Sequence, residues 1–114
     1  MNKIHYSPEA RDDLVAIKKY IGVELVNPSA AKNTVDKIAK RIRDLRQFAE
    51  IGSLLSSVID IDTDYRFLVC GNYLVFYRVI VTDVYIVRVL YGRRDYLAIL
   101  FGYALTDGEG PDTP

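Results

Sequence analysis

Apolar positions between Pro8 and Leu45 recur at intervals of three and four residues, the spacing of one face of an α-helix. The first stripe consists of Ala10, Leu14, Ile17 and Ile21, and the second consists of Ala31, Val35, Ile38, Ile42 and Leu45. Each stripe follows a capping residue and a proline, Ser7-Pro8 and Asn27-Pro28, which together start helices. Because the break between the stripes is short, we predict an antiparallel helical hairpin.

The pattern changes after Gly52-Ser53 to segments rich in Val, Ile, Tyr and Phe, which favour strands. We predict strands over residues 58–61, 65–70, 73–81 and 84–91. Two-residue breaks at Gly71-Asn72 and Thr82-Asp83 separate the last three segments, as in a meander with tight turns. We also predict a strand over residues 3–6 and a helical turn over residues 95–100.

These elements predict an α+β fold, in which an N-terminal strand and an antiparallel helical hairpin pack on an antiparallel β-meander. The 114 residues suffice for a single domain, placed at residues 1–105, followed by an acidic and disordered tail at 106–114. The net charge is zero, but the tail holds three carboxylates and no base, so residues 1–105 carry +3. A body of this charge permits contact with nucleic acid or an acidic protein without requiring either.

If both turns have two residues, one row of side chains crosses three strands. Arg66 then faces Tyr77, and Tyr77 faces Arg88, so that all three point to one side of the sheet. Three interpretations remain open: a solvated arginine pair, an anchor for an acidic partner, and a phosphate-binding or catalytic surface. At the end of the last strand, Arg93 and Arg94 extend this basic surface.

Both faces of the predicted sheet are apolar. One face holds Leu68, Val75, Val79 and Ile86, and the other holds Phe67, Leu74, Phe76, Ile80, Val87 and Val89. The helical hairpin can cover only one face, so we expect residues 97–105 or a partner chain to cover part of the other.

Several function classes lack support in the sequence. A single cysteine, Cys70, and a single histidine, His5, cannot build a zinc site, and no glycine-rich phosphate loop is present. We therefore predict neither a metal nor a cofactor. No apolar run is long enough for a membrane span, and the N-terminus has no apolar signal region, which predicts a cytoplasmic protein without membrane contact.

Three segments together resemble the toxins of the RelE/ParE superfamily. They are SPEARDDLVAIKKYI (residues 7–21), YRFLVCGNYLVFYRV (65–79) and VLYGRRDYLAILFG (89–102). The resemblance implies a bacterial toxin of a type II toxin-antitoxin module, neutralised by a cognate antitoxin whose C-terminal segment wraps it. Such a partner would use the spare apolar face and the arginine row.

The superfamily contains two mechanisms. RelE-like members cleave mRNA on the ribosome without a metal, and under that resemblance the catalytic residues would be Arg66, Arg94 and Tyr96. ParE-like members inhibit DNA gyrase by protein contact. Leucines occupy three positions where the nucleases carry functional side chains, namely Leu68, Leu74 and Leu100.

We therefore predict gyrase inhibition, with mRNA cleavage as the alternative and an inactive interaction module as the second alternative. The predicted surface for the target or the antitoxin comprises Arg66, Tyr77, Arg88, Arg93 and Arg94.

Overall fold

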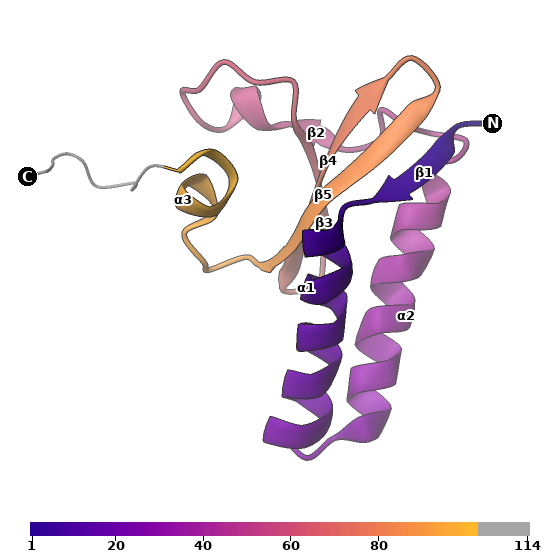
Figure 1. Ribbon diagram of the computed structural model, residues 1–114, viewed down its shortest axis with the longest axis vertical. Helices are drawn as coiled ribbons and strands as arrows, with labels where there is room; N and C mark the ends of the chain where they lie inside the picture. Colours follow the sequence, from indigo (N-terminus) through magenta and orange to yellow (C-terminus); the bar gives the residue numbers. More distant parts are fainter. Residues whose placement is uncertain (103–114) are drawn as a thin grey trace, which may run out of the picture.

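A computed structural model describes residues 1–102, which form a five-stranded sheet with a helical hairpin on one face and a short helix on the other (Figure 1). The strands are β1 (Lys3–Tyr6), β2 (Ser53–Leu54), β3 (Arg66–Cys70), β4 (Tyr73–Ile80) and β5 (Asp83–Tyr91). The helices are α1 (Pro8–Lys19), α2 (Pro28–Asp44) and α3 (Tyr96–Phe101), with single helical turns η1 (Tyr20–Glu24) and η2 (Leu55–Ser57). The predicted α+β fold is confirmed, while the predicted tail at 106–114 lies outside the described residues.

The two helix starts are formed as predicted. The Ser7 hydroxyl accepts the Ala10 amide at 2.9 Å, and the Asn27 side-chain oxygen accepts the Ala30 amide at 3.1 Å. Each bond satisfies an N–H that the first helical turn would otherwise leave without a partner. Within the described residues, no helix is both long enough and apolar enough to cross a membrane.

The strand order in the sheet is β1-β5-β4-β3-β2, with β1 parallel to β5 and the other pairs antiparallel. The meander is confirmed, but the strand predicted at residues 58–61 is wrong. There the amides of Val58 and Ile59 both bond to the Leu55 carbonyl, so the chain turns instead of extending. This turn places Leu55 and Ile59 in one apolar cluster under α3, while the short β2 pairs with β3 earlier in the chain.

The predicted turn at Gly71-Asn72 is confirmed, since Cys70 pairs with Tyr73. The second turn lies one residue earlier than predicted, at Val81-Thr82, because Ile80 pairs with Asp83. This turn places Ile86 opposite Tyr77, and a β-bulge then shifts the register of β4 and β5, so that Phe76 faces Arg88.

The predicted row across three strands is therefore wrong. Arg66 does face Tyr77, but Arg88 does not. The row fails for two reasons, because the earlier turn and the extra residue of the bulge each change which side chains oppose one another.

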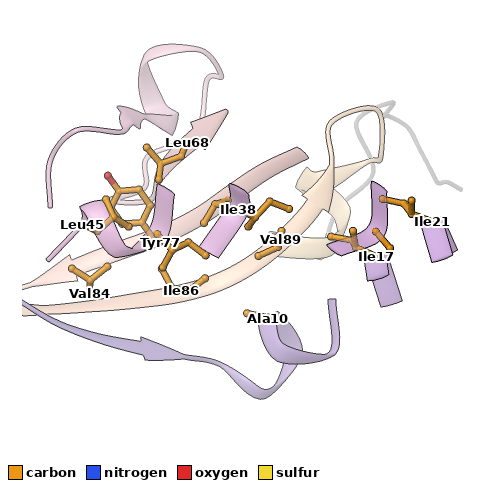
Figure 2. Packing of buried hydrophobic residues seen from close by; sticks show 13 residues of the cluster. Ala10, Ile17, Ile21, Ile38, Leu45, Leu68, Tyr77, Val84, Ile86 and Val89 are labelled. Carbon is orange, nitrogen blue, oxygen red and sulfur yellow. The ribbon is translucent and has the colours of Figure 1, made fainter. Parts of the chain in front are cut away.

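Two apolar clusters lie on opposite faces of the sheet. The helix-side cluster is built around Ile17, Ile38, Leu68, Tyr77 and Ile86, and Figure 2 shows Tyr77 at one end of this cluster and Ile17 at the other. The α3-side cluster contains Leu55, Phe76 and Leu90, and the α3 residues Tyr96, Ile99, Leu100 and Phe101 pack on it.

The expectation that residues after 96 cover the second face is thus confirmed as far as Phe101. Val89 was predicted on that second face but lies in the helix-side cluster. The bulge, which adds a residue to β5 between Ile86 and Arg88, reverses the alternation of the residues that follow.

Candidate functional site

The hydroxyl of Tyr77 holds a loop to the sheet. The Tyr77 side chain is 0% exposed, and its Oη donates to the Ala49 carbonyl at 2.8 Å and accepts the Gly52 amide at 2.9 Å. Burial raises the pKa of Tyr77, and the Gly52 amide only partly opposes this effect. The hydroxyl is therefore protonated near neutral pH, and its hydrogen bonds are made with the loop. Because the residue is buried, a substrate cannot reach this hydroxyl.

Arg66 binds the same loop. Its Nη1 donates to the Gly52 carbonyl at 2.8 Å and to the Glu50 carbonyl at 3.3 Å. Gly52 has no room for a side chain, because an added Cβ would lie 2.5 Å from the Tyr77 Oη and 2.7 Å from the Phe67 carbonyl oxygen. Arg66 and Tyr77 thus form a fixed support for residues 49–52.

Arg88 belongs to a separate ion pair with α1. Its Nε and Nη2 each donate to a carboxylate oxygen of Asp13 at 2.7 Å, and the Val89 amide donates to the same carboxylate at 2.9 Å. The pair is largely shielded, with side-chain exposures of 23% for Arg88 and 10% for Asp13. The Asp13 carboxylate raises the pKa of Arg88, so the guanidinium stays charged and committed to α1.

A third arginine was missed by reasoning from the sequence. Arg78 forms a two-pronged ion pair with Asp64 at 2.9 Å for both bonds, and its guanidinium lies 5.7 Å from the centre of the Tyr65 ring. The Arg78 side chain holds the pKa of Asp64 below its usual range. The fold brings Asp64 to Arg78 from fourteen residues away in the chain.

The end of β5 carries two accessible arginines. Arg93 and Arg94 are exposed, and neither side chain makes a hydrogen bond or ion pair within residues 1–102. Asp95 caps α3 by accepting the Ala98 amide at 3.3 Å. Tyr96, the first residue of α3, packs on Phe76 with ring centres 5.2 Å apart.

The five predicted site residues and Tyr96 therefore do not meet in one place. Arg66 and Tyr77 support a loop on the helix side, whereas Tyr96 packs into the α3-side cluster. Arg88 is held by α1, and Arg93 and Arg94 stand at the strand end. Among the described residues 1–102, Arg66, Arg94 and Tyr96, which were assigned to RNA cleavage, line no common pocket.

Arg94 does line a groove between the helical hairpin and the ends of β4 and β5. We call it the tyrosine groove, since Tyr20, Tyr73 and Tyr91 line it together with Arg94, and its volume is about 740 Å³. Burial raises the pKa of Tyr73, and the neighbouring Tyr20 and Tyr91 add to the effect. Aromatic rings beside an accessible arginine are the composition typical of protein-binding sites.

Within the described residues, no three His, Cys, Asp or Glu side chains lie close enough to hold a metal ion. Cys70 is half-buried, and burial raises the pKa of its thiol, which makes it a poor nucleophile. The chemistry at the end of β5 and in the tyrosine groove is cationic and aromatic, suited to contact with another macromolecule.

A family model described as "ParE toxin of type II toxin-antitoxin system, parDE" matches residues 4–96. Among solved structures, the chain resembles one from P. aeruginosa described as a chromosomal ParDE TA system. The two are 25% identical, the match covers 80% of this chain and 96% of that chain, and the TM-score is 0.67. No match was found among curated proteins. The family match extends from β1 to the first residue of α3, and so includes every strand.

Proposed function

Because the chain belongs to the ParE family of type II toxin-antitoxin toxins, we propose that it inhibits DNA gyrase by direct protein contact and that its cognate antitoxin holds it inactive. The antitoxin partner follows from the family. Gyrase as the target follows from the resemblance to ParE-like rather than RelE-like members.

One observation supports the choice of mechanism: the residues assigned to RNA cleavage lie apart in the fold, and Arg66 is bonded to a loop. A metal-free cut requires a base for the 2′-hydroxyl, an acid for the leaving oxygen and cations for the phosphate. Arg66 bonds to two loop carbonyls, Tyr96 packs into the α3-side cluster, and Arg94 lies exposed at the end of β5. Tyr77, the tyrosine opposite Arg66, is buried and bonded on both sides. The arrangement supports a toxin that works by contact.

Two further positions agree with this choice. Leu68 and Leu74 occupy positions where the resemblance places basic side chains in the nucleases. Leu68 belongs to the helix-side cluster and Leu74 packs on the α3-side cluster, so each leucine contributes to the core. Replacing either with an arginine or lysine would bury a charge, which is costly without a partner.

For the contact surface we propose Arg93 and Arg94 together with the tyrosine groove. These arginines are exposed, have no partner side chain within residues 1–102, and Arg94 adjoins Tyr73 and Tyr91 in the groove. An arginine pair beside tyrosines provides both charge for encounter and aromatic area for binding.

The test compares two purified reactions. The chain is added to gyrase acting on relaxed plasmid, and separately to a translation reaction in which mRNA integrity is followed. We expect loss of supercoiling with intact mRNA. Ribosome-dependent mRNA cleavage with normal supercoiling would overturn the proposal, and loss of neither activity would favour an inactive interaction module.

A variant pair locates the surface. Arg93→Ala with Arg94→Ala removes two positive charges from the strand end, and Lys18→Ala with Lys19→Ala removes two from the end of α1 as the matched control. We expect the first pair to weaken gyrase inhibition at least about tenfold and the control pair to leave it unchanged.

A further inference from the structure

Three arginines gather around Tyr6, where the start of α1 and the end of α2 lie beside β1 (Figure 1). They are Arg11 in α1, Arg43 in the last turn of α2 and Arg46 just after it, and we call them the arginine cluster. Burial raises the pKa of Tyr6, and the positive charges of the cluster oppose this effect, so the three guanidinium groups lie near its ring. The cluster shares no residue with the tyrosine groove or with the strand-end arginines.

The backbone holds the cluster in place. The Asn2 amide donates to the Arg46 carbonyl at 2.8 Å, and the Asn2 side chain donates to the Leu45 carbonyl at 3.1 Å, so the end of α2 is tied to the start of β1. All three arginines are exposed, and none of their guanidinium groups makes a hydrogen bond or ion pair within residues 1–102. Like charges held together repel one another, and a bound anion would relieve this repulsion.

Cations continue from the cluster along α2. Lys37, Lys40 and Arg43 follow one another at intervals of three residues and line one depression of about 350 Å³ on the helix surface. We call them the α2 row; six residues of helix span about 9 Å. The carboxylates of α2 do not cancel this row, because each of the two Asp residues in the helix has a cation partner of its own, Lys32 or Arg41.

Tyr6 adds a neutral donor to the cluster. Its hydroxyl makes no hydrogen bond within residues 1–102, and its raised pKa keeps it protonated near neutral pH. A guanidinium group can donate two parallel hydrogen bonds to a phosphate, and tyrosine hydroxyls also donate to the phosphates of nucleic acids. The cluster and Tyr6 together therefore match a phosphate group.

The α2 row indicates which kind of phosphate would bind. A DNA duplex carries about one negative charge per 1.7 Å of its axis, so several phosphates fall within the span of the row. An isolated phosphate would reach only the cluster, and a peptide would need a run of consecutive carboxylates. A duplex provides such a line of charge along its whole length.

We propose that the arginine cluster, Tyr6 and the α2 row bind the sugar-phosphate backbone of duplex DNA, so that the toxin contacts the DNA held by its target as well as the target itself. The source of the DNA rests on the proposed function, because gyrase acts on duplex DNA. The DNA contact itself does not depend on the target. Backbone contacts carry no sequence information, so the affinity should be similar for unrelated duplexes.

The first test uses the full chain without gyrase. Fluorescence anisotropy of a short labelled duplex should give a Kd of about 10⁻⁴ to 10⁻⁶ M, and the affinity should fall steeply between about 50 and 200 mM salt. Arg43→Ala with Arg46→Ala removes two cations of the cluster, and Lys18→Ala with Lys19→Ala removes two from the other end of the hairpin as the matched control. We expect the cluster variant to bind at least about tenfold more weakly, with a salt slope smaller by about 2, and the control to change less than about threefold.

A conservative variant separates charge from structure. Arg43→Lys with Arg46→Lys keeps both positive charges, so its affinity for the duplex should stay within about threefold of the parent. Circular dichroism confirms that all of these variants are folded.

The second test concerns the source of the DNA. Gyrase holding a duplex should bind the chain at least about tenfold more tightly than gyrase alone, because two contacts act together. The cluster variant should lose this gain and still bind gyrase alone. If the chain does not bind gyrase at all, the proposed target is wrong while the duplex measurement still stands, so the two proposals can fail separately.

Three results would overturn the inference. The first is equal affinity of the cluster variant and the parent for the duplex. The second is tighter binding to a single-stranded RNA of the same length, which would assign the surface to RNA. The third is the same affinity of the chain for gyrase with and without a duplex, which would show that the toxin does not contact the DNA of its target.

Discussion

The replacement Tyr77→Phe tests whether this tyrosine supports the fold or takes part in chemistry. It removes one oxygen and leaves the ring, so packing in the helix-side cluster stays the same. The Gly52 amide, which is buried, loses its acceptor, and the half-buried Ala49 carbonyl loses its donor. An unsatisfied buried group costs about 1–3 kcal/mol.

We expect most of the loss to come from Gly52, because water can reach the Ala49 carbonyl more easily. The free energy of unfolding should therefore fall by about 2 kcal/mol, which corresponds to a drop in Tm of about 10 °C for a domain of this size. Urea denaturation followed by circular dichroism measures the change. The control is Tyr85→Phe, because Tyr85 is 39% exposed and its hydroxyl makes no hydrogen bond within residues 1–102; it should change stability by less than about 0.5 kcal/mol.

Growth inhibition by Tyr77→Phe should persist at a temperature where the variant is folded. The reasoning would be refuted by a variant as stable as the parent, since the two hydrogen bonds would then contribute nothing. It would equally be refuted by a folded variant that has lost all toxicity while retaining its affinity for the antitoxin, since the hydroxyl would then have a chemical role.

Three other expectations concern stability. Arg88→Met should lower the free energy of unfolding by about 3 kcal/mol in urea denaturation, because the shielded Asp13 carboxylate loses its cationic partner. A loss below about 1 kcal/mol would mean that water replaces the guanidinium. Val81→Gly should raise the free energy of unfolding by up to about 1 kcal/mol, and with it the Tm. The reason is that Val81 is 88% exposed and has a φ of 57°, which a β-branched residue adopts only under strain. An unchanged or lower Tm would contradict this. Burial raises the pKa of Tyr73 and Tyr77, so the unfolded chain loses these protons at a lower pH than the folded chain. The free energy of unfolding should therefore fall above about pH 10. This fall should be smaller in Tyr77→Phe than in the parent, and an equal fall would contradict the role given to Tyr77.

The parts of the fold that local patterns determine were predicted well. Ser7-Pro8 and Asn27-Pro28 start the two helices where expected, and Gly71-Asn72 forms its tight turn. Each of these depends on residues a few positions apart, which a single sequence displays directly.

The errors concern positions where the conformation opposes local preference. The β4–β5 turn places Val81 at a positive φ, which β-branched residues avoid, so the sequence favoured the next pair instead. The bulge has no cue in the sequence, and it moved Arg88 out of the predicted row.

The candidate site was less predictable than the fold, since it depends on partners distant in the chain. Arg88 pairs with a carboxylate 75 residues away, and Arg66 bonds to a carbonyl 14 residues away. An arginine's availability depends on such partners. The strand-end arginines, Arg93 and Arg94, were predicted to bind the target or the antitoxin; they are exposed, and their binding role stays a prediction.

The parallel pairing of β1 with β5 bears on when the toxin forms during synthesis. Lys3 is aligned with Asp83, and the Ser7 hydroxyl donates to the Val87 carbonyl at 2.7 Å. During synthesis β1 thus has no strand partner until β5 has emerged, and the helical hairpin lacks most of the sheet on which it packs. The nascent toxin therefore cannot complete its sheet before residues 83–91 have left the ribosome, so its active form appears only after that point of translation.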